Sequence, residues 1–362
     1  MVFNSIFFIF CFLPVFMLIY YLVPGKLRNL LLFLGSLIFY AWGEPVYVIL
    51  MLFSSIFNYY MGTELERLYY DDRKQKINLI FSIIINLAVL VFFKYYGFLL
   101  NTIGGIIGIH IPHPELSLPI GLSFYTFRNL SYLFDIYLSK VSAQRNFLTF
   151  SVYSTMFPYT SAGPIVRYTD IETQLKQRTI NISKFGIGAE LFVKGLAKKV
   201  LLADNLSVLY SSICGHPQMS VFTSWLGILA YTMQLYFDFS GYSDMAIGLG
   251  KMLGFDFNKN FDYPYISTSV SEFWRRWHIS LGSWFRDYIY IPLGGNRVST
   301  LKHIRNILVV WALTGLWHGA SWNFVLWGVY YGLFLLLEKF VLQKYLKKIP
   351  SWLCTVYTML VV

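Results

Sequence analysis

Charged side chains are scarce in this sequence of 362 residues, since Asp, Glu, Lys and Arg together make up only 13% of it. A soluble domain carries roughly 25% charged residues. Hydrophobic residues make up 56% of the chain, and its mean hydropathy is +0.54. Such a composition cannot cover a water-facing surface, and it excludes disordered and small disulfide-stapled proteins. The sequence therefore predicts an integral membrane protein.

Cysteine is equally rare. Cys11, Cys214 and Cys354 lie far apart and form neither a CxxC pair nor a disulfide framework. There is no HExxH motif and no cluster of Cys and His, so we expect no metal site. Phosphate-loop (GxxxxGK[ST]) and nucleophile-elbow (GxSxG) motifs are also missing.

Acidic residues are the scarcer charge, with 18 Asp and Glu against 29 Lys and Arg, a net charge of +11. In a soluble protein this excess would suggest a nucleic-acid partner, but no recognition motif accompanies it. Cytoplasmic loops of membrane proteins accumulate Lys and Arg. We therefore interpret the positive charge as a sign of membrane topology and expect no nucleic-acid binding.

Long uncharged runs indicate where the chain crosses the bilayer, since a helical span needs about 20 apolar residues. Residues 1–25 carry no charge and lack the basic start of a signal peptide, so we expect a retained span with its N-terminus outside. The next two runs, 29–43 and 45–63, are short or borderline for a span, and a hairpin around Glu44 and Pro45 would join them. The further uncharged windows are 29–43, 45–63, 77–93, 146–166, 205–237 and 306–337.

The distribution of Lys and Arg orients these spans. The basic segment 67–76 suits a cytoplasmic loop, whereas 104–118 and 214–219 contain no Lys or Arg and suit the outer face. Residues 251–305 hold eight Lys and Arg interleaved with aromatic residues, a mixture typical of the membrane interface. We predict re-entrant or interfacial helices there, on the cytoplasmic side.

No repeat or soluble linker divides the chain, so we expect one domain over residues 1–362. Only a short apolar segment follows Pro350, which is too short to span a bilayer. We expect the given sequence to stop inside a helix and to lack a C-terminal part.

His318 is the most informative polar residue. It lies in the uncharged run 306–337, which is longer than one crossing and must either tilt or break near residues 319–321. An ionisable group inside a span costs roughly 2.5–3.5 kcal/mol on insertion scales and marks a functional site. A packed histidine bonded to a backbone carbonyl carries about equal weight. At helical spacing one face would carry Trp311, Gly315, His318 and Trp322, with the glycine leaving room for a substrate.

His278 lies at the end of the segment Glu272 to His278, next to two arginines. Guanidinium groups match phosphates and carboxylates, so Arg275 and Arg276 are candidates for binding an anionic substrate. Contact with lipid phosphates is at least as good an explanation for either arginine alone.

Two aspartates follow the uncharged run 205–237. We expect Asp238 and Asp244 either to cap a helix or to position a histidine, with capping favoured for Asp244. Arg128 and Asp135 are seven residues apart on another apolar segment, and we interpret them as a buried structural pair.

At these residues the sequence resembles the membrane-bound O-acyltransferase family, and in particular its alginate O-acetyltransferase branch. The resemblance covers essentially the whole chain. Four blocks carry it: LYFDFSGYSDMAIGLG at 235–250, FWRRWHISLGSWFRDYIYIPLGGNR at 273–297, GLWHGASWNFVLWG at 315–328, and the opening MVFNSIFFIF through NLLLFLGSLIFYAW.

The resemblance implies an all-α polytopic fold, a ring of tilted helices around a central tunnel, in the plasma or inner membrane. It implies that His318 is the principal catalytic histidine and His278 the second. The donor would be acetyl-CoA or another acyl thioester, arriving from the cytoplasm, and no cofactor would be tightly bound. The acceptor would be an extracellular polysaccharide, reached directly or through an extracytoplasmic acetyltransferase partner.

The chemistry agrees with these residues. Transfer of an acyl group from a thioester to a hydroxyl needs a base, and burial favours the neutral, basic form of an imidazole. We therefore assign His318 as general base and His278 as accessory, with indole rings excluding water. The expected substrate-binding residues are Arg275, Arg276, Trp317, Trp274, Asp238 and Tyr242.

Two other functions remain open at this point. The same fold and donor chemistry would serve D-alanyl transfer to a cell-wall polymer, with a small carrier protein as donor. A proton-coupled secondary transporter also uses intramembrane His, Asp and Arg, although the sequence shows no inverted repeat. The sequence identifies neither the polysaccharide nor the hydroxyl that is acylated.

Overall fold

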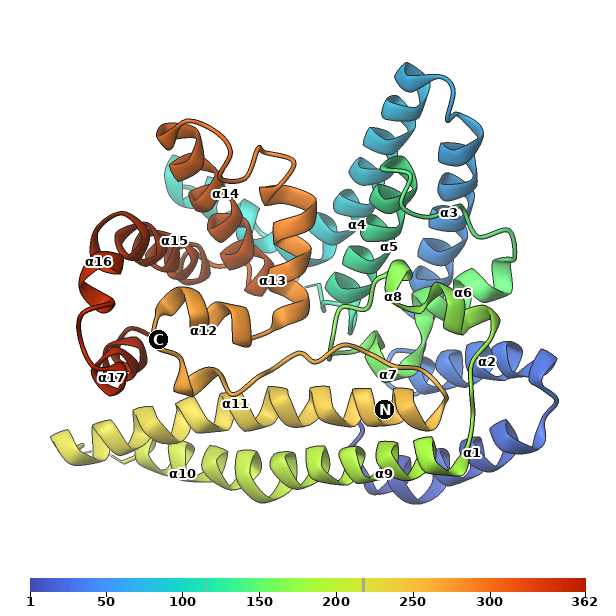
Figure 1. The fold of residues 1–362 in the computed structure, drawn as a ribbon, viewed down its shortest axis with the longest axis horizontal. Helices are drawn as coiled ribbons and strands as arrows, with labels where there is room; N and C mark the ends of the chain where they lie inside the picture. Colours follow the sequence, from blue (N-terminus) through green and yellow to red (C-terminus); the bar gives the residue numbers. More distant parts are fainter. Residues whose placement is uncertain (115, 217–218) are drawn as a thin grey trace. The chain divides into compact units, whose positions relative to one another are not determined.

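The computed structural model describes residues 1–114, 116–216 and 219–362, and these ranges contain helices but no strand (Figure 1). The predicted all-α fold is thus confirmed. The helices are α1 (Leu13–Leu22), α2 (Arg28–Ala41), α3 (Val48–Arg67), α4 (Asp72–Ile107), α5 (Leu122–Tyr137), α6 (Phe147–Thr155), α7 (Phe157–Thr160), α8 (Tyr168–Lys176), α9 (Ile182–Ala197), α10 (Asp204–Cys214), α11 (Val221–Met252), α12 (Val270–Arg276), α13 (Ile279–Phe285), α14 (Thr300–His318), α15 (Trp322–Leu337), α16 (Gln343–Leu346) and α17 (Ser351–Val361). Wider π-helical turns cover Phe8–Phe12, Lys198–Ala203, Arg286–Tyr290 and Glu338–Leu342, and 3-10 turns cover Gly25–Leu27 and Pro264–Ile266.

Three helical segments are long and apolar enough to cross a membrane: Val48–Arg67, Asp72–Ile107 and Trp322–Leu346. They overlap the predicted spans at 45–63, 77–93 and 306–337. The other windows fold as shorter or more polar helices, and their crossing of the membrane stays a prediction. Of the predicted outer-face segments, residues 115 and 217–218 lie outside the described residues.

The chain forms two compact units, each built from two separate stretches. The first contains Met1–Tyr60 and Gln144–Lys259, and the second contains Met61–Ala143 and Asn260–Val362. The first boundary along the chain, between Tyr60 and Met61, falls within α3. The expectation that residues 1–362 act as one acyltransferase domain stays a prediction.

The first unit contains a cluster of aromatic rings around Phe157, which is fully buried. The rings of Phe16 and Phe39 lie 5.3 and 5.5 Å from it, centroid to centroid, and Phe12 lies at 5.7 Å. These residues come from the opening of the chain, α2 and α7. Aromatic burial of this kind supplies much of the packing energy of a helical unit.

A long helical pair dominates the rest of the first unit, where α9, a π-helical turn and α10 run alongside α11 (Figure 1). Small residues let the backbones approach closely. A Cβ added to Gly195 would lie 2.5 Å from the carbonyl oxygen of Gly241, and one added to Gly188 would lie 2.6 Å from that of Gly248. Packing of this type is common between membrane helices, because small residues allow close contact.

The aspartates of this pair do not cap helices. Ser220 is the N-cap of α11, its side chain accepting a hydrogen bond from Thr223 N. Asp244 lies inside the helix and pairs with Lys198 at 2.6 Å, so the prediction that it caps a helix is wrong. The uncharged run 205–237 ends within α11 and not before it, so Asp238 and Asp244 lie inside that helix and not at its start.

The second unit is organised around α5, almost all of which is buried. Trp284 donates from Nε1 to the Phe127 carbonyl oxygen at 3.0 Å and stacks on the Phe127 ring. Asp135 accepts from the Tyr288 hydroxyl at 2.8 Å and pairs with Lys140 at 3.2 Å. Arg128 and Asp135 are both buried, as predicted, while their pairing with each other stays a prediction.

The uncharged run 306–337 breaks where predicted, since α14 ends at His318 and α15 begins at Trp322. Two expectations about this run were wrong. Trp322 belongs to α15 and therefore shares no α14 face with His318. Gly315 leaves no room for a substrate, because a Cβ there would overlap the Phe324 carbonyl oxygen and lie 3.2 Å from Gly328 Cα. The glycine is the crossing point of two helices.

Candidate active site

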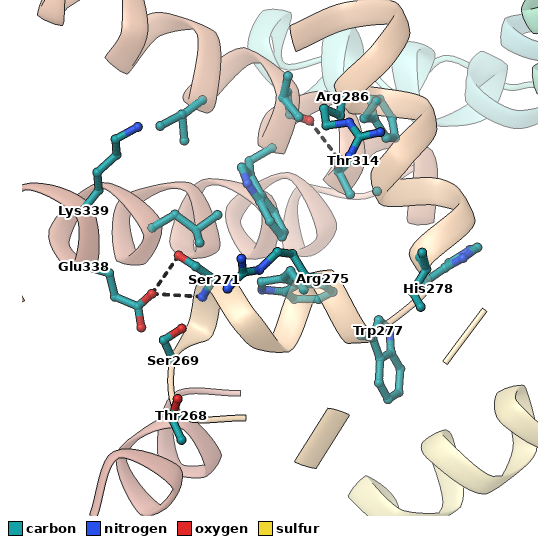
Figure 2. Close-up of a pocket in the computed structure, with 18 of the residues that line it drawn as sticks. Thr268, Ser269, Ser271, Arg275, Trp277, His278, Arg286, Thr314, Glu338 and Lys339 are labelled. Atoms are coloured by element: carbon teal, nitrogen blue, oxygen red, sulfur yellow. Dashed lines mark hydrogen bonds between the residues drawn. The ribbon is translucent and has the colours of Figure 1, made fainter. Parts of the chain in front are cut away.

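A cavity of about 950 Å³ lies within the second unit, lined by residues between Thr268 and Cys354. Its walls come from α12 and α13 on one side and from α14 and the end of α15 on the other (Figure 2). Both histidines singled out from the sequence line it. His278 and His318 are far apart in the chain, and the fold brings them to one cavity.

His278 occupies the junction between α12 and α13. Its backbone is left-handed, with φ of 46°, which is uncommon for a residue with a side chain. Surrounding contacts hold this conformation. The Asn260 side-chain oxygen accepts hydrogen bonds from Ser280 N at 3.2 Å and from Ser280 Oγ at 2.9 Å, and Ile279 N donates to the Asn260 carbonyl.

The same amide fixes the ring of His278. Nδ1 of His278 lies 3.2 Å from Asn260 Oδ1. Because an amide oxygen only accepts, Nδ1 carries the hydrogen and Nε2 is the basic nitrogen of the neutral ring. The imidazole is 3% exposed, so its orientation is set by the protein and not by solvent.

His318 ends α14 and lies among aromatic rings. Its ring centroid is 4.9 Å from that of Trp327 and 5.1 Å from that of Trp317. Within residues 1–114, 116–216 and 219–362, no protein group hydrogen-bonds its imidazole, so the alternative of a histidine satisfied by a backbone carbonyl is not what the structure shows. The ring nitrogens of His318 are therefore available to a substrate.

One indole connects the two histidines. The Trp317 ring lies 5.8 Å from the His278 ring and 5.1 Å from the His318 ring. Further rings surround this group, since Trp274 contacts Trp311 at 4.9 Å and Tyr331 at 4.8 Å. Trp274 lines the cavity, whereas Trp317 does not. Apolar rings around reacting groups exclude water, which suppresses hydrolysis of an acyl donor.

Positive charge gathers on the cavity wall. Arg275 is exposed to the cavity and has no ion-pair partner in the part of the chain that the structure describes. Arg286 lines the same cavity (Figure 2). It pairs with its neighbour Asp287 at 2.7 Å. Lys339 and Lys347 also line the cavity. These cations can hold an anionic ligand such as a phosphate or carboxylate.

One carboxylate supports the wall. Glu338, at the end of α15, is 3% exposed and accepts a hydrogen bond from Val270 N at 2.6 Å. A second hydrogen bond comes from Ser271 N at 2.9 Å (Figure 2). Glu338 also accepts from Ser271 Oγ at 2.9 Å. These amides are the otherwise unsatisfied donors of the first turn of α12, where negative charge is favourable. Glu338 thus fixes the helix that carries Trp274 and Arg275.

Four predicted substrate-binding residues do not line this cavity, namely Trp317, Arg276, Asp238 and Tyr242. Arg276 turns to Glu272 at 2.8 Å and Asp262 at 3.6 Å. Asp238 pairs with Lys199 at 2.6 Å. Their contact with a substrate stays a prediction.

Tyr242 is the fourth of these residues. Its ring stacks on Phe3 at 4.7 Å, and its hydroxyl bonds the Ser161 hydroxyl. Asp238 and Tyr242 both belong to the first unit, whereas every residue of the cavity wall belongs to the second. The role of Tyr242 in substrate binding likewise stays a prediction.

Sequence reasoning missed Lys94 and Tyr95 of α4. Lys94 donates to the Trp317 carbonyl oxygen, and the Tyr95 hydroxyl donates to the Leu316 carbonyl oxygen at 2.6 Å. The signal was present, because Lys94 interrupts the apolar part of α4, far from the basic start of that helix at residues 73–76. It was overlooked because it ended the uncharged window 77–93 and was treated as the edge of a span.

No group of three or more His, Cys, Asp or Glu in the described ranges is placed to hold a metal ion. The side chains that line this site include two imidazoles, cationic groups and aromatic rings. The expected lack of a metal stays a prediction.

Comparison with known proteins shows which family this chain matches. The model of the membrane-bound O-acyltransferase family, MBOAT, matches residues 42–348, which include the cavity-lining segment almost entirely. The probable alginate O-acetylase AlgI of Pseudomonas aeruginosa is 44% identical over 343 residues, which are 94% of this chain and 66% of that protein. This chain thus spans about two thirds of the length of that relative.

Two relatives with other acceptors are more distant. The peptidoglycan O-acetyltransferase of Helicobacter pylori is 34% identical over 98% of this chain and 75% of that protein. The teichoic acid D-alanyltransferase of Bacillus subtilis is 29% identical over 67% of this chain and 64% of that protein. On the extent of the family match and these identities, the chain belongs to the membrane-bound O-acyltransferase family.

Proposed function

We propose that this chain is a multi-pass membrane O-acetyltransferase of the plasma or inner membrane. It moves an acetyl group from a cytoplasmic thioester donor across the membrane for O-acetylation of an extracellular polysaccharide. The observation that carries the proposal is the pair His278 and His318 at one cavity, with Trp317 against both rings. The greater identity to the two O-acetyltransferase relatives than to the D-alanyltransferase favours acetyl as the group transferred.

In the proposed reaction, His318 is the general base. Its neutral imidazole takes the proton of the acceptor hydroxyl while that oxygen attacks the thioester carbonyl carbon. The tetrahedral intermediate collapses with cleavage of the carbon–sulfur bond, and the thiolate leaves. The proton held by His318 is then returned to the thiolate, so that an ester and a thiol are the products.

His278 has an accessory role in this scheme. The hydrogen bond to Asn260 leaves Nε2 as its basic nitrogen, which suits a residue that accepts a hydrogen bond near the reacting groups. Burial and the Trp317 ring hold it in place. We expect it to orient a substrate or to assist proton transfer, with a smaller effect on rate than His318.

The cations of the cavity wall would hold the donor. Acetyl-CoA carries phosphates, and Arg275, Arg286 and Lys339 line the same cavity as the histidines. Guanidinium groups bind phosphate through paired hydrogen bonds. A carrier protein would present a phosphopantetheine arm with a single phosphate, which the same residues would also accept.

The predicted tunnel and re-entrant helices belong to this proposal. α12 and α13 are too short to cross a bilayer, as expected of re-entrant segments in the basic block 251–305. An extracytoplasmic acetyltransferase partner would complete the transfer to the polymer if the acceptor does not enter the cavity itself.

The test measures base-releasable acetate on surface polysaccharide in cells with wild-type protein, without it, and with His318→Ala at equal membrane abundance. His110→Ala is the matched control, because His110 is exposed. We expect wild type and the control to restore acetate and His318→Ala to fail. An active His318→Ala variant would contradict the assigned base.

Equal acetate in every strain would contradict acetyl transfer. D-alanyl ester content then tests the alternative acyl group. Proton-coupled uptake in reconstituted vesicles, without consumption of a thioester, would support a transporter in its place.

A further inference from the structure

The end of α14 leaves backbone groups that need partners. The helix stops at His318, and Gly319 is extended, with φ of −164° and ψ of 152°. The last carbonyls of a helix have no amide four residues ahead to bond. Gly319 N bonds the Gly315 carbonyl at 3.3 Å, but the carbonyls of Leu316 and Trp317 point beyond the helix.

Two adjacent residues of α4 satisfy these carbonyls. The Tyr95 hydroxyl donates to Leu316 O at 2.6 Å, and Lys94 Nζ donates to Trp317 O. The ammonium group also lies 5.5 Å from the centre of the Trp317 ring. A cation at a helix C-terminus is favourable because it opposes the negative end of the helix dipole.

Placing the Lys94 ammonium group in an apolar helix costs free energy, and this cost suggests a functional role for the residue. It lies well inside α4, a helix that is apolar enough to span a membrane. A lysine near the end of such a helix would extend to the lipid headgroups. Lys94 is half-buried instead and directs its ammonium group at the turn that ends in His318. Intramembrane cations of this kind mark functional sites.

We propose that Lys94 and Tyr95 are positioning residues for His318. Together they fix the final turn of α14 so that the imidazole faces the cavity, and this inference rests on the proposed role of His318 as base. Neither residue touches the reacting atoms. Two donors on consecutive carbonyls fix both the position of that turn along the helix axis and its rotation about the axis. One hydrogen bond alone would not fix both.

The expected effect is on turnover. A misplacement of about 1 Å in a catalytic group can cost about 100-fold in rate. Lys94→Met, which removes the charge and the donor, should lower kcat by about 10- to 100-fold. Lys94→Arg keeps both and should recover most of that loss. Tyr95→Phe removes one hydrogen bond and should lower kcat by about 3- to 10-fold.

The experiment uses the full chain in membranes with acetyl-CoA as donor, and it separates kcat from KM. Tyr96→Phe is the matched control, because Tyr96 contacts His113 and not α14. A second readout needs no activity: hydrogen exchange of the backbone amides at 316–320 in purified protein. We expect faster exchange there in Lys94→Met and Tyr95→Phe, unchanged KM for acetyl-CoA, and wild-type behaviour in Tyr96→Phe.

Several results would overturn the inference. Wild-type kcat in Lys94→Met, or faster exchange with no change in kcat, means that Lys94 and Tyr95 do not position the base. A rise in KM alone means that Lys94 binds the donor. If Lys94→Met does not accumulate, Lys94→Arg and Tyr95→Phe decide by the same criteria. An inactive His318→Ala with a fully active Lys94→Met refutes only the positioning role of Lys94 and Tyr95. An active His318→Ala refutes the proposed function itself.

Discussion

Gly315 of α14 lies so close to Gly328 of α15 that a Cβ on either glycine would come within 3.2 Å of the other's Cα and would overlap the opposite backbone. Each glycine would also meet a carbonyl oxygen, that of Phe324 for Gly315 and that of Trp311 for Gly328. The crossing lies one turn before His318. The geometry of the base therefore depends on two residues without side chains.

Gly315→Ala should separate these helices. Overpacking of this kind typically costs about 1–3 kcal/mol, and we expect a lower thermal midpoint in detergent together with reduced acetyl transfer. Gly105→Ala in α4 is the control, because its Cβ would have no neighbour within 4 Å. Equal midpoints for the two variants would contradict the proposed tight crossing.

Asn260→Ala should reduce turnover by releasing His278. The variant leaves Ser280 N and Ser280 Oγ without their acceptor and frees the imidazole to rotate. We expect kcat to fall about tenfold, which is part of the contribution that a positioned acid–base residue makes. Asn205→Ala, an exposed asparagine on α10, should behave as wild type.

A double-mutant cycle decides whether Asn260 acts through His278. If it does, Asn260→Ala has little further effect in a His278→Gln background. An undiminished tenfold loss in that background would mean that Asn260 acts by another route.

Glu338→Ala should destabilise the cavity wall. Hydrogen bonds to a charged group contribute roughly 1.5–3 kcal/mol each at most, and this buried carboxylate accepts three. We expect a loss of about 2–4 kcal/mol in the free energy of unfolding, with a smaller loss for Glu338→Gln, which keeps one acceptor oxygen. Glu190→Ala on the exposed face of α9 is the control. Equal losses for the two Ala variants would contradict a structural role for Glu338.

Glu272 should make the α12 region sensitive to acid. The backbone hydrogen bond from Thr268, with further help from the Thr268 hydroxyl and Arg276, lowers the pKa of Glu272 below its ordinary value of 4.5. A lowered pKa in the folded state means that the carboxylate stabilises the fold above pH 4.5, and that this stabilisation disappears as the pH falls through the lowered value.

The measurement compares thermal midpoints of wild type and Glu272→Gln. Wild type should be the more stable at pH 6, and the difference should shrink towards zero in more acidic buffer. A difference that stays constant down to strongly acidic pH would mean that ionised Glu272 contributes nothing beyond its shape.

Much of the fold followed from composition and from runs of apolar residues. A tilt of the run 306–337 or a break near residues 319–321 was predictable because a span has a maximum length. The all-helical class was predictable because apolar runs of about 20 residues cross a bilayer as helices. Pairing between distant segments was not predictable in this way. No local pattern indicates that Lys94 would reach the carbonyl of Trp317, because that contact joins residues 223 positions apart.

The candidate site was likewise predictable only where a local pattern marked a residue, and not where distant segments meet. A histidine in an apolar run marked His318 on physical grounds, but only the family resemblance linked it to His278. Gly315 was misread because a glycine on a helix face suits a ligand or another helix equally well, and the sequence does not say which. Trp322 was placed on the wrong helix because spacing arguments hold only while a helix continues.

The interleaving of the two units has a consequence for biosynthesis. The second unit is built from Met61–Ala143 and Asn260–Val362. Lys94 and Tyr95 leave the ribosome long before the carbonyls that they bond, since 221 residues separate Tyr95 from Leu316. At roughly 5–20 residues per second, an apolar helix with an unpartnered ammonium group must wait on the order of 10–45 s in the membrane. Quality control that recognises charged transmembrane segments would meet this protein during that interval, and a slow ribosome would lengthen its exposure.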